Sequence, residues 1–486
     1  MELFPNPQTV IQIGPLSIQW YAVLILAGAF AVLHFMKKAF AKMGYDAEVA
    51  DDLFTGGILL GVIGARIWYV LFSDFGAYLQ DPISMLNIRE GGLAIQGGLF
   101  GGMLFGYYYC RKHKMSFLRI FDVIAPYVLI AQAIGRWGNF INKEAFGEKV
   151  TEAYFQHWPS FLNFIKEGMF VSGSYREPMF FYESILCIIG FVLILLYRHF
   201  SKPKRGDMVY CYLLWYGAIR FWIEARRSDS LMFMGLKMAQ LVSIAFIVIG
   251  LLGLLGFIRK WMKKTKPIIL FDLDGTLLDT EEVIFASYKH VFSKYKPELE
   301  ITEEQMLEFL GPPLSESMAK HLPEFDVEEL IDCYRKFNIE NHKKYVKAFP
   351  YAKECIVKLK EEGYTLGIVS TKFKDVIELG LECCKMEGYF DVILGLHEYE
   401  NNKPAKDGLI KACKVLNVSQ DDCIYVGDSP SDIIAAHNAG MYSIAYISNE
   451  KRAEALKATN PNKIIYDLSK IDEILKEDIS WTYNTM

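Results

Sequence analysis

The chain has 486 residues, which is more than one ordinary domain holds, and its net charge of −5 is too small to define its class. Hydrophobic residues make up 52% of the chain and crowd the first half, whereas charged residues crowd the second half. This division excludes a single soluble domain and predicts a membrane-embedded half followed by a half that folds in water.

Seven apolar stretches in the first half approach or reach the roughly 20 residues that a helix needs to cross a membrane. They are residues 17–36, 52–72, 91–109, 120–135, 179–197, 208–223 and 239–258. Lys and Arg cluster after the first, third, fifth and seventh stretches, and the alternate loops carry fewer positive charges. Because positively charged loops stay in the cytoplasm, we expect the N-terminus outside and the C-terminal half in the cytoplasm.

The fourth stretch ends in GRWGNFINKEAFG, residues 135–147, which contains Arg136, Asn139 and Glu144. Ionisable groups at membrane depth are costly and usually functional. A guanidinium at this position suits a lipid phosphate, which it binds through two parallel hydrogen bonds. The charge count places this polar segment at the outer face.

The sixth stretch contains YGAIRFWIEARR, in which Tyr216, Arg220, Glu224 and Arg227 recur at helical spacing and share one face. A polar stripe in a spanning helix is expected to face the bundle interior or a water-filled cavity. A purely structural alternative is a ladder in which Arg220 and Glu224 form an i,i+4 ion pair. Further polar groups at comparable depth are Arg66 in GARIWYV and Tyr182 with Glu183 in PMFFYES.

These segments resemble the bacterial prolipoprotein diacylglyceryl transferase family over roughly residues 5–262. The segment 135–147 matches the family signature G-R-x-G-N-F-x-N-x-E-x-x-G, and EGGLAIQGGLFGG, GARIWYVLF, YES and YGAIRFWIEARR match other landmarks in order. The resemblance implies a seven-helix enzyme of the bacterial cell membrane that needs no cofactor. It would transfer the diacylglyceryl group of phosphatidylglycerol to the lipobox cysteine of a prolipoprotein signal peptide and release glycerol phosphate.

The resemblance also implies roles for individual residues. Arg136 and Arg220 would bind the phosphate and stabilise its developing charge, and Glu144 would complete the catalytic set. The substrate site would be shaped by Tyr21, Arg66, Gln96, Asn139, Tyr216 and Glu224.

The chain departs from the family pattern at two positions. Gln96 and Glu177 stand where many members carry His. Glutamine cannot act as a base at neutral pH, and a cysteine thiol must lose its proton to attack. Either Glu144, Glu177 or water accepts that proton, or the enzyme is slow.

After Lys266 the sequence changes to short apolar strands that alternate with amphipathic helices. The strands are expected in PIILFDLDGT, YTLGIVST, DVILGL, DCIYVGDS and YSIAYI, a pattern that predicts a parallel α/β sheet. Residues 281–348 lack a clear strand and predict a helical insertion after the first strand. We therefore expect a membrane domain over 1–262 and a cytoplasmic domain over 263–486, with a helical cap at about 281–348.

Two carboxylates follow the first strand of the second half. Asp272 and Asp274 are two residues apart, so they face the same side of an extended chain. One carboxylate can attack phosphorus while the other transfers the proton. Ser370 follows the next strand, and its hydroxyl suits a phosphate oxygen.

Further polar residues follow later strands. Lys403 can neutralise phosphate charge, and Asp428 and Asp432 in GDSPSD suit a hard ion such as Mg²⁺. Ligands of open α/β sheets bind at the carboxyl ends of the strands, where all of these residues fall.

FDLDGT, LGIVST, NNKPAKDG and VGDSPSD match, in order, the four motifs of the haloacid dehalogenase-like phosphatases, which residues 267–480 resemble. The resemblance implies that Asp272 is the nucleophile, that Asp274 is the general acid and base, and that Ser370 and Lys403 hold the phosphoryl group. Mg²⁺ would be held by Asp272, the Asp274 carbonyl and Asp428, with support from Asp432. The segment looks most like the phosphoglycolate phosphatase and pyrophosphatase branch, which implies a small phosphate ester or pyrophosphate as substrate.

The leading hypothesis is a bifunctional chain that joins a lipid transferase to a phosphatase. A second hypothesis treats the membrane half as an inactive lipid-binding anchor for the phosphatase, and Gln96 supports it. No nucleic-acid partner is expected.

Overall fold

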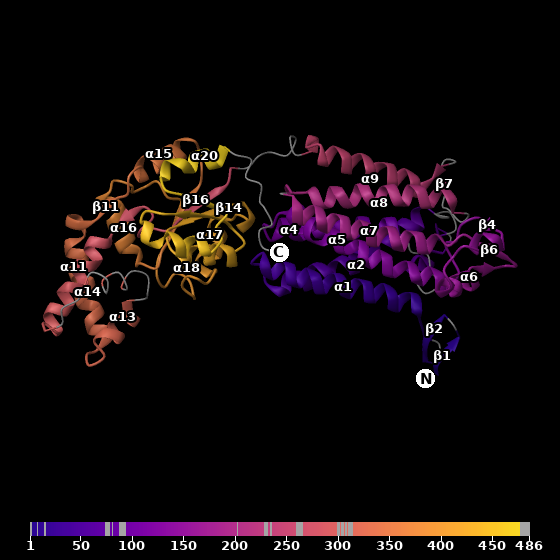
Figure 1. The fold of residues 1–486 in the computed structure, drawn as a ribbon, viewed down its shortest axis with the longest axis horizontal. Helices are drawn as coiled ribbons and strands as arrows, with labels where there is room; N and C mark the ends of the chain where they lie inside the picture. Colours follow the sequence, from indigo (N-terminus) through magenta and orange to yellow (C-terminus); the bar gives the residue numbers. More distant parts are fainter. Residues whose placement is uncertain are drawn as a thin grey trace.

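The computed structural model describes residues 2–476 apart from residues 7, 14–15, 73–77, 80, 87–93, 202, 228–231, 234–235, 259–265, 299–301, 303–305, 307–308 and 310–313. Figure 1 shows a bundle of long helices beside a smaller α/β unit with its own helical extension. The bundle contains the apolar first half of the chain, and the α/β unit contains the charged second half.

Each predicted apolar stretch coincides with a long helix. Within the described residues these are α1 (Trp20–Lys42), α2 (Ala47–Phe72), α4 (Ile95–Lys112), α5 (Phe117–Asn142), α7 (Met179–Phe200), α8 (Asp207–Arg226) and α9 (Met238–Leu254). By length and composition α1, α2, α5 and α7 are long and apolar enough to cross a membrane, and α9 is a shorter apolar helix. Large apolar side chains such as Phe30, Leu59 and Leu104 are exposed on the bundle, as expected of a surface that faces lipid.

Small β-elements lie at one end of the bundle. A three-stranded antiparallel sheet, made of β1 (Glu2–Asn6), β2 (Thr9–Ile13) and β3 (Leu16–Gln19), precedes α1. Between α5 and α7 the chain forms α6 (Asn163–Gly168) and a small sheet of β4 (Lys149–Val150), β6 (Ser174–Arg176) and β5 (Phe170–Val171). Figure 1 shows α6, β4 and β6 at the end of the bundle that lies away from the α/β unit.

Glycines bring α2 and α4 into close contact. A Cβ at Gly64 would lie 2.4 Å from the carbonyl oxygen of Gly97, and a Cβ at Gly101 would lie 2.3 Å from that of Leu60. Small residues at such an interface let helix backbones approach closely where lipid provides no hydrophobic driving force.

The fourth helix is longer than predicted, because α5 ends at Asn142 rather than at residue 135. The motif of residues 135–147 therefore lies mostly on a helix. Gly135 and Gly138 do not end it, since glycine is common in membrane helices and Gly138 packs against the ring of Tyr21. The predicted stretch therefore ended seven residues too early.

The second half contains a six-stranded parallel sheet in the order β13-β12-β9-β14-β15-β16. The strands are β9 (Ile268–Phe271), β12 (Leu366–Val369), β13 (Val392–Leu394), β14 (Cys423–Gly427), β15 (Tyr442–Tyr446) and β16 (Lys463–Ile465). The first five were predicted and β16 was not. Every residue of β9, β12, β14 and β15 is buried, because helices cover both faces of a parallel sheet.

The helices around this sheet follow the strands in chain order. They are α15 (Ala352–Glu361), α16 (Lys374–Cys383), α17 (Asp407–Leu416), α18 (Pro430–Asn438), α19 (Ala453–Ala458) and α20 (Ile471–Lys476). Separate apolar clusters lie on the two faces, one around Phe271 and Ile356 and the other around Leu270 and Ala435.

A helical cap stands between β9 and β12. It contains α11 (Glu281–Tyr295), α13 (Leu314–His321) and α14 (Val327–Tyr345), and the short antiparallel strands β10 (Leu278–Asp279) and β11 (Lys347–Ala348) join it to the sheet. The cap has its own apolar core around Tyr288 and Met318. Figure 1 places the cap on the side of the α/β unit that lies away from the bundle.

A buried histidine in the cap predicts a pH-dependent stability. His342 of α14 is fully buried, with Nδ1 3.2 Å from Asn338 Oδ1, and burial and Lys372 lower its pKa to about 4 although Asp274 opposes them. Unfolded His titrates near 6.5, so the unfolded state binds more protons between pH 6.5 and 4. We expect the cap to lose about 2–3 kcal/mol of stability as pH falls through that range.

Hydrogen exchange of the α14 amides in the full-length protein at pH 7 and pH 4.5 measures this loss. His342→Gln is expected to remove most of the pH dependence, and His290→Gln, at a half-buried site in the same cap, is expected to keep it. An equal pH dependence in the unmodified protein and both variants would contradict the assignment of the stability loss to His342.

Candidate active sites

Charged groups from α5, α7 and α8 meet inside the bundle. Arg136 Nε lies 3.0 Å from Glu183 Oε2, and Arg220 Nη1 lies 3.5 Å from the same oxygen. Arg220 Nη2 also lies 2.7 Å from Glu224 Oε2. Glu183 and Glu224 are almost completely buried, so the two predicted arginines are held together by buried carboxylates.

A second set of contacts continues from Arg136 toward the end of α5. Arg136 Nη1 donates to Asn139 Oδ1 at 3.3 Å, and Asn139 Nδ2 donates to Glu144 Oε1 at 3.0 Å. Tyr21 of α1 packs on Gly138, where a Cβ would lie 2.5 Å from its ring. The structure therefore brings Tyr21, Asn139 and Glu144 to the neighbourhood of Arg136, as their shared assignment to one site requires.

The remaining predicted residues of the membrane half lie as follows. Tyr216 is buried on α8 one turn before Arg220 and stacks on Tyr212, with ring centroids 5.7 Å apart. Arg66 donates to the carbonyl oxygens of Ser84 and Met85, both at 2.8 Å, and so contacts a different segment, the 3₁₀ helix Pro82–Leu86. Gln96 belongs to the first turn of α4, but its side chain lies outside the described residues.

Sequence reasoning noted Glu183 as a polar group at membrane depth but left it out of the site, and the structure places it between the two arginines. A signal existed, because an acid inside the apolar run MFFYESILC is expected to have a buried cationic partner. Arg220 and Glu224 form the i,i+4 ion pair that the purely structural alternative predicted. Because Arg220 also reaches Glu183, this pair is part of a larger cluster.

Glu177, the second departure from the family pattern, lies near the start of α7. Its carboxylate Oε1 accepts from Arg226 Nη1 at 2.8 Å and from the Tyr154 hydroxyl at 3.2 Å. Its described partners therefore hold its buried carboxylate in an ion pair with the half-exposed Arg226.

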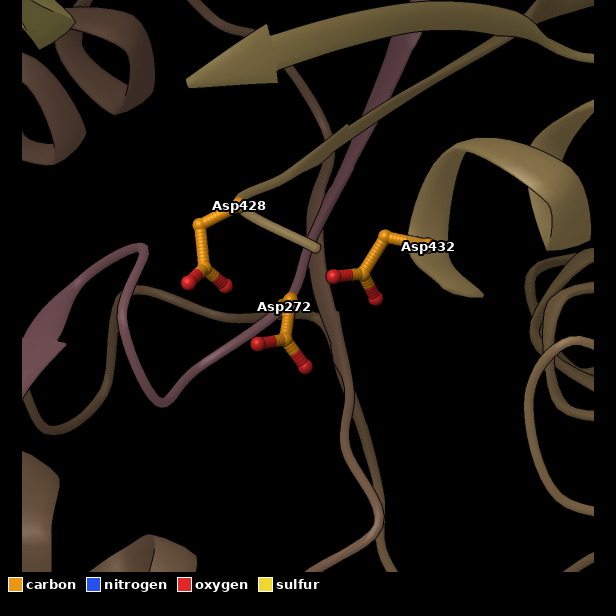
Figure 2. A group of neighbouring side chains, drawn as sticks. All are labelled: Asp272, Asp428 and Asp432. Carbon is orange, nitrogen blue, oxygen red and sulfur yellow. The ribbon is translucent and has the colours of Figure 1, made fainter. Parts of the chain in front are cut away.

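Three carboxylates meet at the carboxyl edge of the α/β sheet (Figure 2). Asp272 follows β9, Asp428 follows β14 and Asp432 lies in the first turn of α18, and ligand atoms of all three lie within 4.8 Å of one another. The register explains this, because β9 and β14 are neighbours with Phe271 opposite Val426.

Lys403 lies in this cluster as predicted. Its Nζ donates to Asp272 Oδ1 at 2.5 Å, to Asp432 Oδ1 at 2.7 Å and to the Tyr425 hydroxyl at 2.8 Å. Burial raises the pKa of Asp272 well above its ordinary value, and Lys403 opposes that rise. Burial also raises the pKa of Asp428 to about 7, with Asp432 adding to the rise and Arg452 opposing it.

The three-carboxylate cluster fits Mg²⁺. Its donors are hard oxygens, and a divalent cation would relieve the repulsion among buried carboxylates. Gly275 has φ +81° and a Cβ there would lie 2.2 Å from Asp428 Oδ2, so only glycine lets the loop pass this close to the carboxylate.

Asp274 and Ser370 lie beside the cluster. The Asp274 side chain accepts from Thr280 Oγ1 at 2.7 Å and pairs with Lys372 Nζ at 2.6 Å, so it is not a member of the three-carboxylate cluster. Ser370 is buried after β12, and its hydroxyl accepts from the Lys372 amide at 3.3 Å.

Sequence reasoning missed Lys372, Tyr425 and Arg452. Arg452 Nη1 lies 2.9 Å from Asp428 Oδ2 although the two residues belong to different elements. No local spacing indicates that contact, whereas Lys372 stands two residues after Ser370 and was recognisable as part of the same loop.

The fold and the two sites define a membrane protein with several apolar helices and an attached α/β hydrolase domain. A family model for prolipoprotein diacylglyceryl transferase matches residues 8–256, and one for haloacid dehalogenase-like hydrolase matches residues 269–446. The chain is 41% identical over 250 residues to the phosphatidylglycerol–prolipoprotein diacylglyceryl transferase of Streptococcus pyogenes serotype M5 (strain Manfredo). That alignment covers 51% of this chain and 93% of the relative.

The chain belongs to the prolipoprotein diacylglyceryl transferase family, and its second half carries a haloacid dehalogenase-like domain. Both resemblances drawn from the sequence are thus confirmed. Among solved structures, a haloacid dehalogenase-like hydrolase from Streptococcus pneumoniae is 22% identical with a TM-score of 0.40, covering 43% of this chain and 98% of that one. CbbY from Rhodobacter sphaeroides, solved in complex with phosphate, is 20% identical with a TM-score of 0.39, covering 43% and 96%.

Proposed function

We propose that the membrane half transfers the diacylglyceryl group of phosphatidylglycerol to the thiol of a lipobox cysteine in a prolipoprotein. The observation that carries this proposal is the convergence of Arg136 and Arg220 on Glu183 inside an apolar bundle. The Streptococcus pyogenes relative has this activity in its name, and it supports the assignment of substrate.

The reaction needs a thiolate and a stabilised leaving group. The thiol loses its proton, the thiolate attacks the glyceryl carbon of the lipid, the carbon–oxygen bond to the phosphate breaks, and glycerol phosphate leaves with the electron pair. Arg136 and Arg220 stabilise the charge that develops on the phosphate, in a site of low dielectric constant. Glu144 is linked to Arg136 through Asn139 and is our candidate for the proton acceptor.

We propose that Glu183 holds the guanidinium groups of Arg136 and Arg220 at a spacing that lets both bind one phosphate group. Glu183→Gln removes the charge but keeps the shape, and we expect transfer to a lipobox peptide to fall by about tenfold or more. The reason is that leaving buried arginines without their carboxylate costs about 3–5 kcal/mol. The measurement is the rate of peptide lipidation by purified protein in nanodiscs, together with the thermal unfolding midpoint.

Glu152→Gln is the matched control. Glu152 forms an ion pair with Lys166 at 2.6 Å, but its side chain is 67% exposed, so its loss is worth at most about 1 kcal/mol. A Glu183→Gln protein with the rate and midpoint of the Glu152→Gln protein would refute the proposed role of Glu183.

We also propose that the second half, residues 263–486, hydrolyses a small phosphate ester or pyrophosphate in the cytoplasm. The support is the buried group of Asp272, Asp428 and Asp432 with Lys403 at the carboxyl edge of the sheet. Asp272 attacks phosphorus and forms an aspartyl phosphate, while the leaving oxygen takes a proton from Asp274. Water activated by Asp274 then hydrolyses the acyl phosphate and releases phosphate.

Other residues of the hydrolase half hold the phosphoryl group and the ion. Ser370 and Lys403 would bind phosphoryl oxygens, and Asp272, Asp428 and Asp432 would hold Mg²⁺, together with the Asp274 carbonyl. The ion supplies positive charge next to the phosphoryl oxygens. A screen of pyrophosphate, phosphoglycolate and other small phosphates with the full-length protein and Mg²⁺ tests this proposal, and phosphate release from none of them would contradict it.

A further inference from the structure

The hydrolase domain contacts one end of the membrane bundle, and most of the contacts are made by the amino edge of its sheet. Residues 420–422 immediately precede β14, and Gly440 stands two residues before β15. Both segments contact the turn between α1 and α2, residues 43–46, or the turn between α4 and α5. These turns and the one between α7 and α8 form the bundle end that lies beside the α/β unit in Figure 1.

Asp421 is the centre of this interface. It is completely buried, and its described side-chain donors all come from the membrane half: the Tyr45 hydroxyl at 2.7 Å, the Ser116 amide at 3.4 Å and the Arg119 guanidinium. Arg119 also donates to the carbonyl oxygen of Gly440 at 3.2 Å. A buried carboxylate needs such a complete set of donors, which the membrane half supplies.

Two glycines allow the backbones to touch beside this ion pair. Gly44 has φ +76°, and a Cβ there would lie 2.4 Å from the carbonyl oxygen of Asn438. Gly440 has φ +67°, and a Cβ there would lie 2.0 Å from the carbonyl oxygen of Met43. Gln420 Nε2 donates to the same Met43 oxygen at 2.8 Å, so the contact is packed and hydrogen-bonded.

Charge pairs flank this centre. Arg205, in the turn between α7 and α8, lies 3.2 Å from Asp422 Oδ1 and donates to the Asp421 carbonyl oxygen at 3.2 Å. Lys406, three residues after Lys403, donates to the Gly44 carbonyl oxygen at 2.8 Å and pairs with Asp46 at 2.9 Å. The interface therefore also touches the segment that carries the lysine of the hydrolase site.

Because the sheet is parallel, the interface determines which way the active site of the hydrolase domain faces. All six strands run in one direction, so the edge that docks on the bundle is opposite the edge that carries Asp272 and Asp428. Asp422 and Asp428 flank β14 and are six residue steps apart, which is about 20 Å at the usual rise of a strand. The cap lies beyond this site, on the far side from the bundle (Figure 1).

We propose that the Arg119–Asp421 interface docks the hydrolase domain on the membrane half with its active site turned away from the bilayer, so that the site takes a water-soluble phosphate compound rather than a phosphorylated lipid. The choice of substrate class rests on the proposed phosphatase function, whereas the docking itself does not. Phosphate groups of bilayer lipids lie at the membrane surface, on the other side of the sheet from Asp272.

Hydrogen exchange of the full-length protein in nanodiscs tests the docking. We expect residues 43–46 and 438–441 to be protected in the unmodified protein. Asp421→Ala and Arg119→Ala should each raise exchange in both segments at least about tenfold while β9 and α5 stay protected, and the reversed pair R119D/D421R should restore part of the protection. High exchange in the unmodified protein, or no change in either single variant, would overturn the proposal.

Phosphate release tests the substrate class. Unmodified protein in nanodiscs is given dioleoyl phosphatidic acid in the bilayer, its soluble analogue glycerol 3-phosphate, or pyrophosphate, with Asp272→Asn as the blank. The proposal expects release from a soluble compound and at least about tenfold less from the lipid; faster release from the lipid would overturn it. Release from none of them would contradict the phosphatase function, while hydrogen exchange still decides the docking.

Discussion

Arg136→Ala is expected to lower the rate of lipobox-peptide lipidation by about 10²–10³-fold, the usual effect of removing one preorganised donor to a developing oxyanion. Arg136 lies 3.0 Å from Glu183 and bonds to Asn139, so its loss also separates the arginine pair from the Asn139–Glu144 contact. Arg136→Lys is expected to recover little, because an ammonium cannot bind a phosphate through two parallel hydrogen bonds. The measurement is the initial rate at saturating phosphatidylglycerol, with the mass of the peptide as readout.

Arg111→Ala is the matched control, since Arg111 is exposed in the last turn of α4. Its rate should equal that of the unmodified protein. Equal rates for Arg111→Ala and Arg136→Ala would contradict the assigned role of Arg136. A membrane half that serves only as an anchor would show no transfer in any variant, and Gln96→His would then gain nothing.

Asp272→Asn is expected to reduce phosphate release by at least about 10⁴-fold, because a carboxamide cannot form the acyl phosphate and loss of a nucleophile is among the largest single effects in enzymes. The substitution is not expected to unfold the domain, since burial already raises the pKa of Asp272 and makes its charge costly. Phosphate release from the best small substrate, measured with Mg²⁺, checks this result.

Asp375→Asn, at an exposed site in the first turn of α16, is the control for Asp272→Asn and should keep full activity. Lipidation of the lipobox peptide should be unchanged by either substitution, because the Asp272 site lies in the hydrolase domain, which contacts the end of the bundle that is away from Arg136. Arg119, which contacts the hydrolase domain, and Arg136 are 17 residues apart on α5, or about 25 Å along a helix. Residual phosphate release above about 1% in Asp272→Asn would contradict a nucleophilic role.

Periodic patterns predicted the architecture well. The seven apolar stretches correspond to seven helices within the described residues, and the five predicted strands occur in one parallel sheet. Hydrophobic length and alternation determine such elements locally. Strand β16 was missed because this edge strand holds only two apolar residues, Ile464 and Ile465, and the fourth apolar stretch was ended at residue 135 although α5 continues to Asn142.

Motif spacing predicted which residues form the hydrolase site, but it did not predict which other side chains contact them. Asp272 and Asp428 were expected together because both follow parallel strands, and β9 and β14 proved to be neighbours. Arg452, which pairs with Asp428, comes from a segment without any motif. In the membrane half, Glu183 was recognisable as an acid in an apolar helix, but its position between two arginines depends on how α5, α7 and α8 pack.

The interface between the two halves could not be predicted from sequence patterns. Asp421 stands in a polar segment that reads as an ordinary loop, and its burial depends on a residue 302 positions away. Gly44 has a positive φ and follows a helix, as glycine commonly does. Its sequence position therefore indicates a helix end and gives no sign of its contact with the hydrolase domain.

The most direct test of the account is a single experiment on the purified full-length protein in nanodiscs that contain phosphatidylglycerol. The protein is given a lipobox peptide, and both the peptide mass and released glycerol phosphate are followed. We predict that the unmodified and Asp272→Asn proteins add one diacylglyceryl group per peptide cysteine with one glycerol phosphate released, and that Arg136→Ala does not. An unmodified protein that leaves the peptide mass unchanged, or a peptide lipidated equally by Arg136→Ala, would contradict the account.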